Sequence, residues 1–255
     1  MDVPELTFIP VLGVGQVRPG DDLVSLLGSA LEAGGIALLP GDILVVTQKI
    51  VSKAEGRYVA LRDVQVGDRA AELAAVTGKD KRLVQLVLDE ASAVVRAAKD
   101  VLITRHRAGH VTANSGVDQS NSGSSDADFA LLLPADADAS ARKLRAGFAE
   151  RYGWAIGVVI SDSFGRPWRI GTVGVALGAS GVPALWDRRG ETDRDGRELK
   201  VTQVAIGDML ATAAGLVMGE GAEGVPAVLV RGLTLPALDV PAAALIRPLE
   251  QDLFQ

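Results

Sequence analysis

Two aspartates have the neighbours and spacing that suit metal chemistry. Asp162 directly follows the apolar run VVIS and precedes Ser163, and Asp118 lies in the polar segment NSGVDQSN. A carboxylate with an adjacent hydroxyl supplies the oxygen ligands that hard cations prefer, and the glycine and serine amides around Asp118 also suit phosphate. Hard-ion sites draw their oxygens from separate segments, so these distant aspartates are candidates for one site. The alternative for each is an aspartate that caps a helix or closes a turn.

Basic residues follow a second apolar run and also follow Asp162. Lys49 and Lys53 lie in QKIVSK, and Arg166 and Arg169 lie in FGRPWR. Lysine and arginine bind phosphate and carboxylate groups, so these side chains could meet an anionic substrate. Their alternative role is that of solvated surface charges.

The sequence has no complete form of the common nucleotide-binding or zinc-binding motifs. GVGQVR at residues 13–18 has two glycines of the dinucleotide fingerprint but Arg18 in the third place, and G-x-x-x-x-G-K-[ST] does not occur. We therefore expect neither a Rossmann fold nor a P-loop. His106 and His110 are four residues apart with Gly109 between them. We expect solvated loop histidines there rather than a zinc pair.

Composition excludes several function classes. The 255 residues are 48% hydrophobic, 23% charged and 4% aromatic, with a net charge of −6, which disfavours a protein that neutralises or stacks on nucleic acid. The absence of cysteine excludes disulfides and thiolate chemistry. No apolar run is long enough to span a membrane, and the first residues lack a secretion signal. We expect a cytoplasmic protein with no membrane or nucleic-acid partner, built as one large or two intimate domains.

Helices and short strands must position these residues. Helical spacing follows Asp21-Asp22 up to Gly34-Gly35 and recurs at 81–99, 140–151 and 202–221, whereas apolar runs predict strands at 43–46, 101–104, 154–161 and 225–232. The strand at 43–46 leads directly to Gln48, Lys49 and Lys53. Residues 105–140 are rich in Gly, Asn, Ser and Asp, as expected of a long loop, and the alternating charges of 187–197 predict exposed ion pairs.

Five segments in order resemble one known family. They are TQKIVSKAEGR, ANSGVDQSN, LLPADADASA, VVISDSFGRPWRIGTVGVALG and DRRGETDRDGRELKVTQVAIGDMLATAAGLVMGEG. Together they resemble the coenzyme F420-0:L-glutamate ligases, and they span most of the chain. The resemblance implies an α+β fold with mixed sheets and a two-part architecture, formed by residues 1–255 as one ligase domain. The flavin reductase domain that follows this region in an actinobacterial fusion is not expected in this chain.

The resemblance also implies an activity. Members of the family add L-glutamate to F420-0, with γ-linkages after the first, and hydrolyse GTP through a presumed acyl phosphate. The implied cofactors are Mg²⁺ or Mn²⁺ at two divalent sites, together with K⁺, and the implied assembly is a homodimer. Two alternatives stay open: an F420-binding protein without ligase turnover, and a related carboxylate-amine ligase with another acceptor.

Site residues carried over from the family fall on four parts of the sequence. Asp118 and Asp162 would act in catalysis as ligands of the first cation, and Ser163 and Glu220 would serve the second. The implied nucleotide contacts are Val14, Gly15, Gln16, Val17, Gln48, Lys53, Asn121, Met218, Gly219, Glu220, Gly221, Ala222, Glu223, Gly224 and Val225. Ser163 replaces a more usual threonine and keeps the hydroxyl, and Glu220 stands where some relatives have glutamine. Gln48 occupies a variable position.

Overall fold

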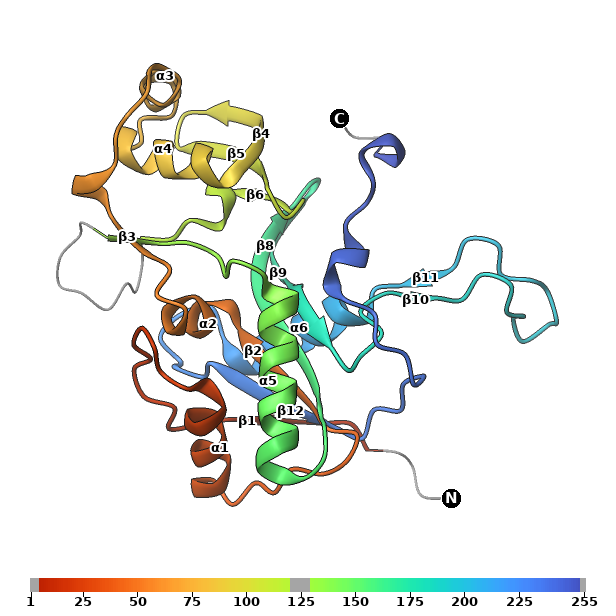
Figure 1. Cartoon of the computed structure of the whole chain (residues 1–255). Helices are drawn as coiled ribbons and strands as arrows, with labels where there is room; N and C mark the ends of the chain where they lie inside the picture. Colours follow the sequence, from red (N-terminus) through yellow and green to blue (C-terminus); the bar gives the residue numbers. More distant parts are fainter. Residues whose placement is uncertain (1–4, 120–128, 253–255) are drawn as a thin grey trace.

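The centre of the protein is a mixed sheet. The computed structural model describes residues 5–119 and 129–252, and its 5-stranded sheet has the order β1-β12-β2-β8-β9 (Figure 1). Only β2 and β8 pair in parallel; the other neighbours are antiparallel. The predicted α+β class is confirmed, and the single parallel pair is unlike a Rossmann sheet. The strands are β1 (Thr7–Pro10), β12 (Ala227–Arg231), β2 (Ile43–Thr47), β8 (Gly157–Arg166) and β9 (Arg169–Ser180).

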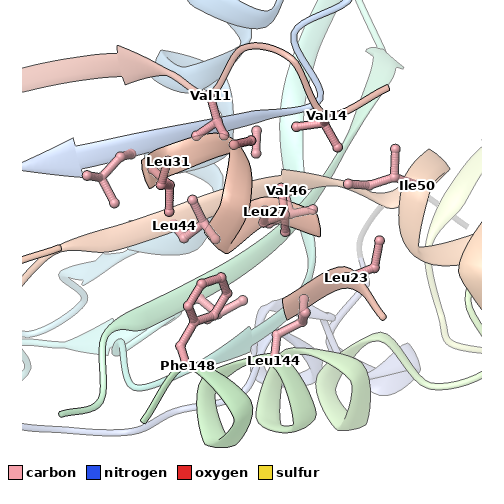
Figure 2. Packing of buried hydrophobic residues seen from close by; sticks show 14 of the residues in the cluster. Val11, Val14, Leu23, Leu27, Leu31, Leu44, Val46, Ile50, Leu144 and Phe148 are labelled. Carbon is pink, nitrogen blue, oxygen red and sulfur yellow. The ribbon is translucent and has the colours of Figure 1, made fainter. Parts of the chain in front are cut away.

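Helices cover both faces of this sheet, which explains why β2 is apolar throughout. Successive side chains of a strand point to opposite faces. Leu44 and Val46 join the core formed with α1 (Leu23–Ala33) and α5 (Ala137–Tyr152), where Figure 2 shows them near Leu27 and Phe148. Val45 joins the core under α6 (Ile206–Met218) on the other face. The predicted helices at 23–33, 140–151 and 202–221 are confirmed with shifted ends.

A smaller part of the chain has its own core, as the two-part architecture predicts. Leu83, Val87 and Leu102 lie at the centre of this core, beside a 3-stranded sheet of order β4-β5-β6 (Figure 1). Across the described ranges, no helix combines the length and apolar character needed to cross a membrane. The elements of this part are α3 (Asp68–Thr77), α4 (Lys81–Glu90), β4 (Ala91–Ala98), β5 (Val101–His106) and β6 (Val111–Ala113).

Shorter elements link the two parts and extend from them. Strands β3 and β7 form an antiparallel pair, and β10 and β11 form the base of a long arm (Figure 1). In that arm Arg188 binds Glu191 at 2.8 Å and Arg189 binds Asp187, so the predicted exposed ion pairs are confirmed. The bounds are α2 (Gln48–Ala54), β3 (Tyr58–Ala60), β7 (Phe129–Leu131), β10 (Trp186–Asp187), β11 (Gln203–Val204), and the 3-10 turns Leu61–Asp63, Asn114–Gly116, Ala242–Leu245 and Leu249–Gln251.

Three sequence predictions are wrong in type or extent. The helix predicted over 81–99 ends at Glu90, because residues 91–98 pair with β5 as a strand. The strand predicted at 154–161 begins at Gly157 and continues to Arg166, since its polar half pairs with β9. Parts of the loop predicted at 105–140 form β6, β7 and the start of α5. Residues 91–98 and 157–166 form hairpins with the strand that follows each of them, β7 pairs with the distant β3, and α5 begins after the Asp136 cap. Strand pairing and capping therefore override the local pattern.

The histidines are not solvated, which corrects another prediction. His106 ends β5 with 8% of its surface exposed, and its Nε2 lies 3.6 Å from an oxygen of Glu90. Burial lowers the pKa of His110 to about 4, so its ring is neutral at pH 7. Within residues 5–119 and 129–252, no group of three His, Asp or Glu side chains is placed to hold a metal ion.

Asp22 caps α1 and gives a test of the local energetics. Its Oδ1 accepts a hydrogen bond from the Val24 N–H at 3.0 Å. Asp22→Ala leaves this amide without its cap, so we expect the free energy of unfolding to fall by about 1 kcal/mol in urea titrations. Asp22→Asn keeps an accepting oxygen and is the matched control. Equal stability of the alanine variant and the unsubstituted protein would contradict this role.

Candidate functional site

A cavity of about 360 Å³ lies where the parallel strands β2 and β8 end. This end of parallel strands is the usual ligand position in α/β sheets, because the chain leaves the sheet there in loops and helix N-termini. Helix α6 and the loop after it form the opposite wall. The lining residues are Gly15, Thr47, Lys49, Ile50, Lys53, Ser161, Asp162, Ser163, Gly174, Ala211, Gly215, Met218, Gly219, Glu220, Gly221, Gly224, Val225 and Pro226.

Asp162 is the half-buried carboxylate of this cavity. It follows the fully buried half of β8, and its Oδ1 accepts a hydrogen bond from the Ser163 N–H at 2.9 Å. Burial raises the pKa of Asp162 to about 6; the charges of Asp118 and Glu220 also raise it, whereas the Ser163 N–H and Lys49 lower it. The charges of Asp118 and Glu220 therefore act on Asp162, and the shared metal site expected of Asp118 and Asp162 stays a prediction.

Two lysines from α2 provide the positive side of the site. Strand β2 ends at Thr47 and α2 begins at the next residue, which places Lys49 and Lys53 on the first helical turns beside the cavity. The Lys49 Nζ lies 2.9 Å from Asp118 Oδ2. Burial and the charge of Lys49 lower the pKa of Lys53, while Asp118 opposes that shift. An anionic ligand would relieve the crowding of these two cations.

Close packing brings the loop after α6 to Ser163. A Cβ on Gly174 of β9 would lie 2.4 Å from backbone atoms of Ala211, so glycine allows α6 to approach the sheet edge. The helix ends at Met218, and the loop that follows carries Glu220 to the Ser163 hydroxyl, which donates to Glu220 Oε2 at 2.9 Å. Residues from β8 and from the distant α6 loop are thus in direct contact at the cavity.

These side chains suit a hard divalent cation. Asp118, Asp162, Ser163 and Glu220 offer only oxygen donors, the ligand type of Mg²⁺ and Mn²⁺. Asp162 is half-buried, and desolvation and the charges of Asp118 and Glu220 raise its pKa, so a cation would offset the cost of charging it. The described residues contain no ready-made cluster of three acidic or histidine ligands, so the hydroxyl of Ser163 or a substrate oxygen would have to complete the shell.

Comparison with known proteins gives the family. The sequence profile of the F420-0:gamma-glutamyl ligases matches residues 12–232. The chain is 47% identical over 257 residues to the coenzyme F420:L-glutamate ligase of Methanopyrus kandleri, covering 99% of each chain. The chain belongs to the F420-0:gamma-glutamyl ligase family. Similar proteins of the same name occur in Methanothermobacter thermautotrophicus, 44% identical over 98% of this chain and 99% of the relative, and Halobacterium salinarum, 45% identical over 86% and 84%.

Many of the residues that the F420-0:gamma-glutamyl ligase resemblance implied line this single cavity. Asp118 joins it through Lys49 rather than as a lining residue. Gln48 does not face the cavity, because it is buried and its Oε1 accepts from Ser52. Asn121 lies outside the described residues. Those that line the cavity are Gly15, Lys53, Asp162, Ser163, Met218, Gly219, Glu220, Gly221, Gly224 and Val225, and those that do not are Val14, Gln16, Val17, Gln48, Asp118, Ala222 and Glu223.

Several lining residues were absent from the implied site. Lys49 had a sequence signal, since it follows the apolar strand next to Lys53. Gly174, Ala211 and Gly215 had none, because small residues in a strand or helix acquire a role only through packing against a distant segment. In this F420-0:gamma-glutamyl ligase family member, they shape the wall rather than carry charge.

Proposed function

We propose that this protein is a GTP-dependent and divalent-metal-dependent ligase that joins L-glutamate to coenzyme F420-0. The observation that carries the proposal is one cavity bordered by Asp162, Ser163 and Glu220 on one side and by Lys49 and Lys53 on the other. Family membership and the printed names of the relatives support the acceptor and the amino acid. Carboxylates that could hold a divalent cation, together with lysines that could bind phosphate, support a nucleoside triphosphate as the third substrate.

The reaction couples two substitutions. An oxygen of the acceptor carboxylate attacks the γ-phosphorus of GTP, the bond from that phosphorus to the β–γ bridging oxygen breaks, and GDP leaves. The glutamate amine then attacks the carbonyl carbon of the acyl phosphate. Inorganic phosphate leaves with the former carboxylate oxygen, and the amine proton passes to solvent. GTP thereby converts a poor electrophile into a reactive one.

The lysines and the carboxylates of the site have different roles in this reaction. Lys53 and Lys49 bind and orient phosphate oxygens, and their half-buried position strengthens that attraction. Asp118 and Asp162 would hold one Mg²⁺ or Mn²⁺, and Ser163 and Glu220 a second, with K⁺ as an additional ion. Bound divalent cations would neutralise the triphosphate and the charge that develops during transfer.

The competing functions predict different products. A silent F420-binding protein would bind the deazaflavin without releasing GDP, and the gathered carboxylates favour the ligase over it. A ligase for another acceptor would release GDP with a different carboxylate. A panel of carboxylate acceptors with L-glutamate, GTP and Mn²⁺, followed by mass spectrometry, separates these functions. We expect F420-0 to be preferred; a product from another acceptor with none from F420-0 would overturn the proposed acceptor.

Ser163 provides a graded test of the second cation site. Its hydroxyl donates to Glu220 and is the oxygen that a cation would share. Ser163→Ala removes that oxygen, so we expect the ligation rate to fall about 10-fold and the Mn²⁺ requirement to rise. Ser163→Thr keeps the hydroxyl and should retain most activity in the same assay. If the alanine variant had an unchanged metal requirement, Ser163 would not be a ligand of the second cation.

We also propose a homodimer formed through the β8–β9 hairpin. Its tip exposes Trp168, with 80% of its surface accessible, and Ile170, which is fully exposed. Burial of such side chains against a second copy would remove apolar surface from water. Light scattering should give twice the chain mass of 26.5 kDa, and Ile170→Asp should shift it to a monomer. Thr172→Ser is a conservative control on the same strand, and a monomeric unsubstituted protein would contradict the proposal.

A further inference from the structure

A second large groove lies at the opposite end of the central sheet from the catalytic cavity. It has a volume of about 620 Å³ and borders the amino ends of β2 and β8, including Ile43 and Gly157. Strand β2 runs from this groove to the catalytic cavity, a distance of roughly 15 Å at about 3.3 Å per residue. The two cavities share no lining residue. A ligand here would therefore occupy a site of its own.

Arg145 of α5 lines this groove as an unpaired cation. Its Nε is shielded from solvent and has no hydrogen-bond partner in the part of the chain that the structure describes. Within residues 5–119 and 129–252, no carboxylate lies within ion-pair distance of its guanidinium, whereas Arg142 and Arg151 of the same helix lie 3.9 Å from Asp136 and 2.9 Å from Glu32. Since a shielded guanidinium is stabilised by an anion, Arg145 marks a place for one.

The backbone near Arg145 is shaped to admit this side chain. Gly181 follows β9 with φ of +73°, and a Cβ there would lie 2.3 Å from Arg145 Nε. Any larger residue would displace the guanidinium. The glycine therefore allows Arg145 to lie flat at the edge of the groove.

Other charges at the groove are already matched. Asp42 is only 1% exposed, and its oxygens accept from Arg231 at 2.9 and 2.7 Å and from the Leu39 N–H at 2.8 Å. Asp239, which does not line the groove, accepts from the Gly181 N–H at 2.7 Å. Among the lining residues, the Asp42 and Arg231 charges offset each other, and Arg145 is the remaining charge. A ligand that binds here must therefore bring a negative group.

Apolar side chains form much of the remaining wall. Leu39 is 46% exposed, and Leu235 and Pro236 come from the segment after β12. A cation at one side and aliphatic walls at the other suit a ligand with two unlike ends. We propose that this groove binds a small amphipathic anion, with its acidic group on Arg145 and an aromatic or aliphatic body against Leu39 and Leu235.

Paired fluorescent probes test this inference on the whole chain. Anilinonaphthalene sulfonate has an aromatic body and a negative group, and N-phenyl-1-naphthylamine has a similar body without charge. Arg145→Gln removes the cation, Arg145→Lys keeps the charge, and Arg142→Gln is the matched control on the same helix. Each variant is titrated with both probes, with and without GTP and Mn²⁺, after its melting temperature has been recorded.

We expect Arg145→Gln to weaken the sulfonate at least about 10-fold while the neutral probe is unaffected, in line with the loss of a charge-assisted contact. Arg145→Lys should retain most of the binding, and Arg142→Gln all of it. In the unsubstituted protein, rising NaCl should weaken only the sulfonate, which tests the charge even if Arg145→Gln fails to fold. Equal loss of both probes, or sulfonate binding insensitive to Arg145 and to salt, would overturn the inference. Probe binding is measured without the ligase reaction, so these outcomes are independent of the proposed activity.

Discussion

Asp162→Asn is expected to lower the rate of glutamate ligation at least about 100-fold while the protein stays folded. Asp162 lines the candidate cavity and is less exposed than Glu220, the other carboxylate that lines it, and the charges of Asp118 and Glu220 oppose its own. Asparagine has nearly the same shape and keeps an oxygen for the Ser163 N–H, but it lacks the charge that attracts a divalent cation. The measurement is the initial rate of GDP release together with the mass of the product.

A matched control for this substitution lies on α6. Asp208 is also a carboxylate whose pKa is raised by burial, and its Oδ1 accepts from the Ala176 N–H at 2.9 Å, but it does not line the cavity. Asp208→Asn should therefore leave ligation nearly unchanged. Mn²⁺ should raise the melting temperature of the unsubstituted protein and of Asp208→Asn, but not that of Asp162→Asn. Full activity in Asp162→Asn would remove this residue from the metal site.

Lys53→Met should raise the KM for GTP about 10- to 100-fold, the effect of losing one hydrogen bond to a charged group. Lys53 lines the cavity, and burial beside Lys49 lowers the pKa of its ammonium group. A bound triphosphate would stabilise that ammonium, and methionine preserves its length without the charge. Steady-state kinetics with GTP as the varied substrate measure the change.

The control for Lys53→Met is Lys143→Met. Lys143 is an exposed lysine of α5 that does not line the cavity, so its variant should keep the KM of the unsubstituted protein. If Lys53→Met lowered kcat alone and left the KM for GTP unchanged, Lys53 would not be a ground-state phosphate contact. If both lysine variants behaved alike, the effect would be one of net charge.

Local sequence patterns predict the core of this fold well and its sheet edges poorly. The apolar run at 43–47 forms a strand because both of its faces are buried, and Asp22 begins a helix as its side chain predicts. Residues 91–98 have helical spacing, yet pairing with β5 makes them a strand. The polar half of β8 is extended because β9 supplies its hydrogen bonds. In both cases hydrogen bonds to the next strand along the chain decide the backbone conformation.

The candidate site was predictable where its residues adjoin one another in the chain. Asp162 with Ser163 stands out as a short motif, whereas Glu220 was implied only by the family resemblance. The structure brings both segments to one cavity. The ion pair of Lys49 with Asp118 joins α2 to a segment far along the chain, so no local pattern could show it. The hydrogen bond from Ser52 to the buried Gln48 side chain likewise depends on which face of α2 packs against the rest of the protein, and the sequence alone does not show this.

Mass spectrometry of a single reaction tests the central claim most directly. The mixture contains the protein, F420-0, L-glutamate, GTP and Mn²⁺ or Mg²⁺, and GDP is followed in parallel. We predict glutamylated F420 and GDP in the complete mixture, with neither when GTP or the metal is omitted. GDP formed without glutamylated product would indicate that F420-0 is not the acceptor. Glutamylated product formed without GTP or without metal would contradict the proposed mechanism.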